Sequence, residues 1–116
     1  MALANGLLHL AIAGGYVDED YVRERTSGFD EVRRVSAAYW LERVERICGV
    51  SVADQRRAVE LIARAERAVV RTAHGAEQHS KGVDTVTALI NFALALGLPP
   101  SGLCERLGRA ARLVRC

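Results

Sequence analysis

Residues 71–97 read RTAHGAEQHSKGVDTVTALINFALALG and decide how the rest of the chain can fold. The stretch joins the end of a short β-branched run to a polar, glycine-flanked loop and then to a strongly apolar helix. α/β enzymes present backbone and side chains to a cofactor in this order, because ligands bind beyond the carboxyl ends of the strands. The loop is therefore the first candidate for a ligand site.

The run before the loop, residues 68–73, predicts one short buried strand. Val69 and Val70 are β-branched, and the run is too short for another helix. No other part of the chain reads as a partner strand. Because each unpaired backbone group of a buried strand costs roughly 1–3 kcal/mol, we expect this strand to pair with another chain or with sequence absent from this one.

Hydrophobic periodicity predicts four or five helices in the remainder of the chain. They begin near Leu3, after Asp18 as an N-cap, near Asp30, after a Ser51 capping pair and near Asp84. The second and third are separated by residues 26–28, and the third is expected to bend near residue 40 and to end at a glycine.

Two of these helices carry further expectations about burial. The helix after Ser51, which should reach about residue 67, is expected to bury a stripe at i, i+3, i+4 and i+7, namely Ala58, Leu61, Ile62 and Ala65. The helix from Asp84 is apolar nearly all round, so we expect it to be covered on most sides.

Composition describes one small globular domain. The 116 residues are 50% hydrophobic and 26% charged, and the formal net charge is only +2, too small to argue for a nucleic-acid or membrane partner. No apolar run approaches the roughly 20 residues of a membrane span. Cys48, Cys104 and Cys116 show no close pairing, so no metal motif or disulfide framework is supported and a cytoplasmic location is expected.

The polar loop contains the cluster HGAEQH at residues 74–79. Its H-x-x-E-x-H spacing is one residue off a zinc motif, so no metal site is predicted. It could be an ordinary solvated loop. As a ligand-facing loop, Gly75 and Gly82 would let the backbone approach a ligand closely, and Gln78 would offer a donor and an acceptor to a heterocycle edge.

Three other side chains have structural interpretations as well as functional ones. Asn91 lies inside an apolar helix, as a satisfied amide or as a cofactor contact. His9, on a largely apolar helix, is interpreted as structural. Cys48, directly before a glycine, is interpreted as a small core residue rather than a nucleophile. No catalytic residue is predicted, because the chain contains no Ser-His-Asp set, P-loop or GxGxxG motif.

Residues 40–67 could also form a helix-turn-helix with Gly49 in the turn. Its phosphate contacts would be Arg56, Arg57, Arg64 and Arg67. Acidic residues interrupt this basic face and nearly cancel its field, namely Asp54, Glu60 and Glu66. A small DNA-binding or helical interaction module is therefore the alternative function.

The chain resembles a central segment of the large bacterial molybdopterin oxidoreductases, which include nitrate reductases and formate dehydrogenases. Three stretches carry the resemblance: NGLLHLAIAGGYVDEDYVRERTSGFD (5–30), ERVERICGVSVADQ (42–55) and GAEQHSKGVDTVTALINFALALG (75–97). The last is the most specific, with a Gly-x-x-Gln-His-x-x-Gly loop followed by an Asn-x-Ala-Leu helix. The Ala-Glu-Gln-His-Ser-Lys wording is most similar to cytoplasmic assimilatory nitrate reductases.

The resemblance implies a cofactor and candidate contacts. Family members carry molybdenum bound by two molybdopterin guanine dinucleotides (bis-MGD), and often a [4Fe–4S] cluster. Gln78 matches the loop glutamine that contacts the pterin, His74 falls where another contacting side chain is placed, and Gly75 would be the close-approach glycine. The cysteine run for the cluster is missing, so no metal ligand is predicted here.

The resemblance covers residues 3–98 and ends there. Residues 99–116 replace the expected glycine-rich pterin loop, so Cys104 and Cys116 have no family role. Four arginines recur there every third residue, Arg106, Arg109, Arg112 and Arg115, which fits a basic amphipathic helix or, as we prefer, a shifted reading frame.

Together these features predict a mainly α chain with one short strand, cut from a Rossmann-like α/β domain. The parent would reduce nitrate to nitrite by two electrons. The isolated fragment should be inactive, and its partners would be the rest of the parent enzyme and the pterin cofactor.

Overall fold

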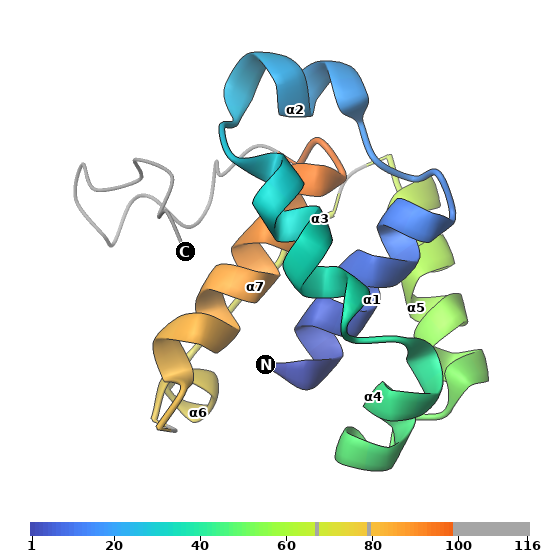
Figure 1. Ribbon diagram of the computed structural model, residues 1–116, viewed down its shortest axis with the longest axis vertical. Helices are drawn as coiled ribbons and strands as arrows, with labels where there is room; N and C mark the ends of the chain where they lie inside the picture. The colour runs from blue at the N-terminus through green and yellow to red at the C-terminus, as the bar shows by residue number, and fades with distance from the viewer. Residues whose placement is uncertain (67, 79, 99–116) are drawn as a thin grey trace.

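A computed structural model of the chain describes residues 1–66, 68–78 and 80–98. Over these residues the chain forms helices and no strand (Figure 1). In chain order the helices are α1 (Ala2–Ala13), α2 (Glu19–Arg25), α3 (Phe29–Ala37), α4 (Leu41–Cys48), α5 (Val52–Arg64), α6 (His74–Glu77) and α7 (Gly82–Ala95).

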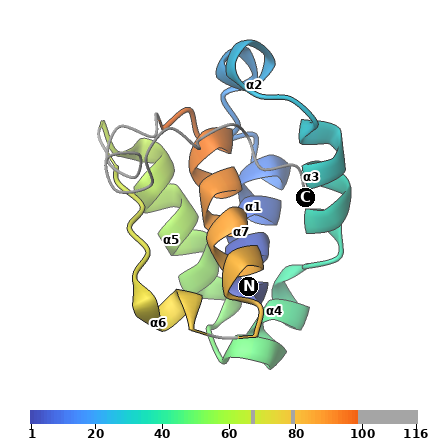
Figure 2. The ribbon, with the colours of Figure 1, turned by 90° about the vertical axis from the view of Figure 1, so that its left-hand side faces the viewer.

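The centre of the fold is the pair α1 and α7. Helix α1 packs most extensively on α7 and also contacts α3, α4 and α5; Figure 2 shows α5 on one side of the pair and α3 on the other. Ala11 and Ala95 are fully buried, and their small side chains let two helices pack closely. Leu8, Val59 and Phe92 fill the space around them, each only 1% exposed. The core therefore combines residues from both ends of the described chain.

Helix α1 also packs closely against α4 at Gly6. A Cβ atom at this position would lie 2.7 Å from Cγ2 of Val44, and the Val44 side chain is fully buried. Such a contact is too short for real atoms, so one of the helices would have to move. The glycine is therefore required by packing rather than by backbone conformation.

The predicted caps at Asp18 and Ser51 are confirmed. The Asp18 carboxylate accepts a hydrogen bond from the Tyr21 amide at 2.9 Å, and Ser51 Oγ accepts one from the Asp54 amide at 3.1 Å. Each satisfies a backbone donor that the first helical turn leaves free. The predicted termination at Gly49 is also confirmed, since this residue ends α4 with a left-handed φ of 73°.

Asp18 also joins the α1–α2 connection to the end of α7. Its backbone N–H donates to the carbonyl of Ala95 at 2.8 Å. Gly97 follows in the left-handed region, with φ of 68°, and a Cβ atom there would lie 2.6 Å from a carboxylate oxygen of Asp18. One residue thus contacts two helix ends.

The predicted helix from Asp30 to Gly49 is two helices. Helix α3 ends at Ala37, and Trp40 adopts an extended conformation with ψ of 159° before α4 begins. The expected bend near Trp40 is therefore a complete break. It lets α3 and α4 contact different parts of α1.

The predicted buried stripe of α5 is only half right: Ile62 packs against the core and Ala58 is partly buried, but the other two residues are not. Leu61 is 63% exposed and Ala65 is exposed, whereas Gln55 and Val59 are buried. The Gln55 amide donates hydrogen bonds to the carbonyls of Leu41 (3.2 Å) and Val50 (2.9 Å), which hold this polar side chain inside. The hydrophobic pattern did not identify Gln55 as buried, so the predicted stripe lay partly on the wrong side of the helix.

The predicted strand at residues 68–73 does not form in this chain. The segment belongs to no helix or strand, and Val69 is 70% exposed rather than buried. A strand is defined by hydrogen bonds to a neighbour, and the described residues provide none. The segment has the β-branched residues of a strand, but among the described residues it has no hydrogen bonds to a neighbouring strand.

Helix α7 begins at Gly82, two residues before the predicted Asp84, and is less covered than expected. Phe92 and Ala95 are buried, but Val83 is 78% exposed and Leu89 and Ile90 are only partly buried. No described helix is long and apolar enough to cross a bilayer. The predicted tail, residues 99–116, lies outside the described residues.

Candidate functional site

The candidate loop starts as one turn of helix rather than as an irregular loop. Ala73 is extended, with φ of −147° and ψ of 179°, and α6 then closes with hydrogen bonds from the Ala76 amide to the Ala73 carbonyl (2.9 Å) and from the Gln78 amide to the His74 carbonyl (3.0 Å). Four residues are too few for helical periodicity to be visible in a sequence, so this turn could not have been predicted.

This turn brings two of the three predicted site residues together. His74 and Gln78 are four residues apart, so their side chains leave the same side of the helical turn. Both are exposed, and neither side chain forms a hydrogen bond with another described residue. Gly75 lies next to His74, and a Cβ atom added there would contact nothing within 4 Å. An imidazole, an amide and an open stretch of backbone therefore share one surface.

Gly82 has a structural role instead of the ligand-facing role considered from the sequence. A Cβ atom at Gly82 would collide with the backbone carbonyl of Glu77. The glycine therefore lets the α6–α7 corner close on itself. Lys81 precedes it, and its carbonyl accepts hydrogen bonds from both the amide and the hydroxyl of Thr85 at 3.0 Å, which fixes the start of α7.

The charges around the corner are mixed. His74, Glu77, Lys81 and Asp84 are all exposed, so the corner has no strong field of one sign. Across the described ranges, no three His, Cys, Asp or Glu side chains converge as metal ligands. His79, the second histidine of the cluster, lies outside the described residues. The described groups therefore offer hydrogen bonds rather than metal ligands.

The groups at this corner can hydrogen-bond one polar edge of a ligand. The Gln78 amide can supply one donor and one acceptor. The unobstructed backbone at Gly75 would admit a flat ring, because no side chain stands in front of it. One amide and one imidazole do not by themselves enclose a ligand.

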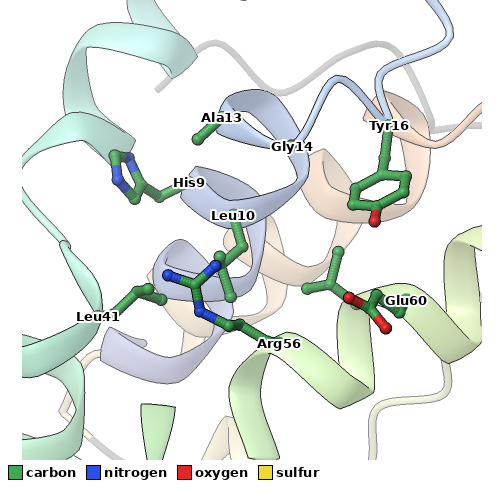
Figure 3. A pocket seen from close by; sticks show the side chains of 9 residues that line it. His9, Leu10, Ala13, Gly14, Tyr16, Leu41, Arg56 and Glu60 are labelled. Atoms are coloured by element: carbon green, nitrogen blue, oxygen red, sulfur yellow. The ribbon is translucent and has the colours of Figure 1, made fainter. Parts of the chain in front are cut away.

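A hollow lies at the C-terminal end of α1, apart from the α6–α7 corner. It has a volume of about 320 Å³ and is open to solvent (Figure 3). Its lining contains apolar and polar side chains from α1, α4, α5 and the α1–α2 connection: His9, Leu10, Ala13, Gly14, Tyr16, Leu41, Arg56, Val59 and Glu60. None of the predicted cofactor contacts lines it.

The polar side chains of this hollow stand on two sides. Figure 3 shows His9, Leu41 and Arg56 on one side and Tyr16 and Glu60 on the other. His9 was interpreted as structural, and the structure places it partly buried at this hollow rather than in the core. Sequence reasoning missed the hollow because its lining residues are separated by up to 51 positions and belong to three helices.

The α4–α5 pair has the outline of the alternative helix-turn-helix. Gly49 forms the turn, and the arginines of α5 are exposed. Asp54 and Glu60 are exposed on the same helix, so the mixed charge expected from the sequence is present at the surface. Arg67 lies outside the described residues. The exposed residues of α4 and α5 therefore show no feature that is specific to DNA binding.

The remaining candidate side chains are not part of the α6–α7 corner. Cys48 is exposed at the end of α4, so its interpretation as a core residue is wrong. Leu41 and Val44 supply the buried face of α4 instead. Asn91 is partly buried on α7. Cys104 and Cys116 lie outside the described residues.

Known proteins share both the sequence and the helical arrangement. Formate dehydrogenase H of Escherichia coli is 36% identical over 106 residues, which cover 89% of this chain and 15% of that enzyme. The assimilatory nitrate reductase catalytic subunit of Bacillus subtilis is 33% identical over 104 residues, covering 87% and 15%. The solved acetylene hydratase of Pelobacter acetylenicus superimposes with a TM-score of 0.81 at 22% identity, covering 87% and 14%.

No protein-family model matches the sequence. The relatives nevertheless agree with one another, since they are molybdopterin oxidoreductases and each aligns over most of the chain. The chain spans about 15% of the length of these relatives. It therefore belongs to the molybdopterin oxidoreductase family, of whose members it corresponds to one short segment.

Proposed function

We propose that the α6–α7 corner forms one edge of a pterin-cofactor site in a longer molybdopterin oxidoreductase. The observation that carries this proposal is the surface shared by His74, Gly75 and Gln78. It combines an exposed amide, an imidazole and open backbone shortly before an apolar helix. Family membership supplies the ligand class, because relatives of this family depend on molybdenum cofactors.

Each residue has a distinct role in this proposal. Gln78 hydrogen-bonds the pterin edge as donor and acceptor, His74 adds a second polar contact one helical turn earlier, and Gly75 leaves room for the ring. The cofactor itself, as bis-MGD, would supply molybdenum for electron and oxygen-atom transfer. A [4Fe–4S] cluster would belong to another part of the parent, and no residue of this chain is assigned to it.

The proposed parent reaction is the reduction of nitrate. Nitrate takes up two electrons and two protons, one N–O bond breaks, and nitrite and water form. The nitrate reductase of Bacillus subtilis among the relatives supports this choice. Formate oxidation is the second candidate, because the formate dehydrogenases of Escherichia coli and of Methanocaldococcus jannaschii match at 36% and 31% identity.

The isolated chain is proposed to be inactive and to act only with the rest of a cytoplasmic parent. The described corner supplies one side of a ligand site, and an edge alone cannot exclude water or hold a large cofactor. The measurement is metal analysis of the purified 116-residue chain after expression with molybdate. We expect no bound molybdenum, and a stoichiometric content would contradict the proposal.

A chimaera tests the pterin contact. Residues 1–98 would replace the aligned segment of the Bacillus subtilis nitrate reductase catalytic subunit, and molybdenum content and nitrate reduction would be measured. Gln78→Ala should lower both by about tenfold or more, since loss of one buried hydrogen bond to a ligand costs about 1–2 kcal/mol. Gln78→Glu, which keeps the shape but removes the donor, should also be impaired.

The matched control is Ser80→Ala, an exposed position in the same corner that has no proposed contact. It should leave molybdenum content and rate unchanged. If Gln78→Ala behaves like Ser80→Ala, Gln78 does not contact the cofactor. A parallel chimaera in formate dehydrogenase H separates the two substrates, because we expect the nitrate reductase to accept the segment with the smaller loss of activity. The reverse ranking would favour formate.

A further inference from the structure

We propose that the hollow at the C-terminal end of α1, called the α1 hollow below, binds a small zwitterion whose ammonium and carboxylate groups stand at opposite ends of an apolar chain. The α1 hollow is separate from the α6–α7 corner, so the inference does not rest on the proposed function. Its apolar floor, its fixed wall and its two unpaired charges of opposite sign carry the proposal.

The floor of the α1 hollow is apolar and belongs to the core. Leu10, Leu41 and Val59 line it, and all three are members of the buried cluster. They come from α1, α4 and α5, so the floor lies where three helices meet. The volume of about 320 Å³ lies at the lower end of the range of small-molecule pockets, about 300–1,000 Å³. The α1 hollow therefore has the size and the floor for a small molecule with an apolar body.

The wall formed by Tyr16 is fixed by the chain itself. The Tyr16 amide donates to the carbonyl of Ala11 at 2.9 Å, and the ring packs against the core. A Cβ atom at Gly14 would lie 2.6 Å from Cε2 of the Tyr16 ring, so only a glycine there leaves the ring in its place. Because this wall exists before a ligand arrives, binding does not have to order it.

The two charged side chains of the α1 hollow lie on different sides of it. Figure 3 shows the Arg56 guanidinium on the side of His9 and the Glu60 carboxylate on the side of the Tyr16 hydroxyl. Arg56 and Glu60 are four residues apart on α5, but arginine before glutamate is the less favourable order for pairing. Neither forms an ion pair or a hydrogen bond with another described residue. Both charges are therefore available to a ligand.

This arrangement selects a molecule that carries both charges, well apart. A simple anion would be attracted by Arg56 and repelled by Glu60, and a simple cation would meet the reverse. With both charges present, Arg56 and His9 donate N–H groups to the carboxylate, while Glu60 and the Tyr16 hydroxyl accept from the ammonium. The chain between the charges lies on the apolar floor. An α-amino acid carries both charges next to one carbon, so it cannot reach both sides. An ω-amino acid can.

A nuclear magnetic resonance titration of the purified 116-residue chain tests the ligand class. With ε-aminocaproate we expect saturable amide shifts at the C-terminal end of α1 and in α5, with a Kd of about 1 mM, because exposed ion pairs contribute little. Norleucine has the same atoms with its charges adjacent, and it should bind at least about fivefold more weakly, as should hexanoate and hexylamine. Equal affinity for ε-aminocaproate and norleucine, or shifts that do not saturate, would overturn the proposal.

Two substitutions assign the two ends of the ligand. Arg56→Gln should weaken ε-aminocaproate and hexanoate by about fivefold, the loss of one exposed ion pair, and should not weaken hexylamine. Glu60→Gln should weaken ε-aminocaproate and hexylamine by a similar factor and should not weaken hexanoate. Both side chains are exposed, so circular dichroism should show unchanged folding. A merely structural role would weaken all three ligands together, and that result would contradict the assignment.

Arg57→Gln is the matched control. Arg57 is an exposed arginine of the same helix that does not line the α1 hollow, and its substitution removes the same charge as Arg56→Gln. Binding of ε-aminocaproate should be unchanged. An equal loss in both variants would mean attraction by net charge alone and would overturn the proposal. Gln78→Ala should also leave this binding unchanged, so the pterin proposal and this one fail independently.

Discussion

The α1–α7 pair and the segment from residue 68 to residue 78 are opposite kinds of structure in one small chain. The helix pair satisfies its backbone internally and buries side chains such as Leu8 and Phe92. Its residues 68–73 expose alternate side chains, its residues 68–72 form no backbone hydrogen bond with another described residue, and its α6 turn carries the candidate cofactor contacts. The first region is closed by its own packing, whereas the second exposes side chains and backbone to solvent.

The difference shows how a short helical chain can hold its shape. A helix makes its main-chain hydrogen bonds with itself, so a set of helices can pack once their apolar faces meet. A strand makes them with its neighbours, and it loses them when the neighbours are absent. The buried core and the proposed cofactor contacts therefore lie in different parts of the chain, and substitutions should separate their effects.

Among these substitutions, Phe92→Ala should lower the free energy of unfolding the most, because it removes packing between α1 and α7. The ring is 1% exposed, and removing it leaves a cavity between α1 and α7. We expect a loss of about 3–5 kcal/mol in the free energy of unfolding, measured by chemical denaturation and circular dichroism. Val83→Ala, at a position of the same helix that is 78% exposed, is the control and should change stability by less than about 0.5 kcal/mol. Equal effects would mean that α7 is not packed as described.

Gly6→Ala should cause the second-largest loss of stability. The added methyl group would overlap Cγ2 of the fully buried Val44, so we expect a loss of about 1–3 kcal/mol despite the better helix propensity of alanine. Thermal unfolding of the single variant and of Gly6→Ala with Val44→Ala provides the check. The double variant should lose less than the sum of the two single losses. Simple additivity would show that the two positions do not touch.

Ser51→Ala should have a smaller effect on stability, because it alters only the N-cap of α5. The Ser51 hydroxyl accepts from the Asp54 amide and donates to its carboxylate at 2.7 Å, so its removal frees a backbone donor at the start of α5. We expect a loss of about 1 kcal/mol by denaturant titration. Ser27→Ala, an exposed serine that forms no described hydrogen bond, should be neutral. A neutral Ser51→Ala would contradict the capping role.

Val69→Ala should have the smallest effect on the stability of the isolated chain. It thereby tests the difference between the packed helices and residues 68–73. The side chain is 70% exposed, so the free energy of unfolding should change by less than about 0.5 kcal/mol. Val59→Ala removes the same two methyl groups from the core, where the residue is 1% exposed, and it should cost several times more. Similar losses at the two valines would show that residues 68–73 already pack within the chain.

The helical part of the fold was largely predictable, and the exceptions have physical reasons. Caps and stop signals are local, so Asp18, Ser51 and Gly49 were identified from neighbouring residues alone. The rotation of α5 was not, because Gln55 is held inside by carbonyls that belong to Leu41 and Val50. A hydrophobicity pattern counts a glutamine as exposed, and only tertiary hydrogen bonds reverse that assignment.

The candidate site was predictable in residue type but not in shape. The sequence indicated His74, Gly75 and Gln78 as one group, and the structure places them on one helical turn. It did not indicate that Gly82 closes the corner against Glu77, because this contact depends on how the chain folds back. The hollow lined by His9, Arg56 and other residues was missed for the same reason.

The double contact of Asp18 has a consequence for how the chain opens. Its carboxylate caps α2, while its amide holds the carbonyl of Ala95 at the end of α7. Two segments more than 70 positions apart in the sequence therefore share one anchor, and they should fray as a single foldon rather than independently. Loss of this anchor would raise the opening rates of residues 19–25 and of the last turn of α7 by the same factor.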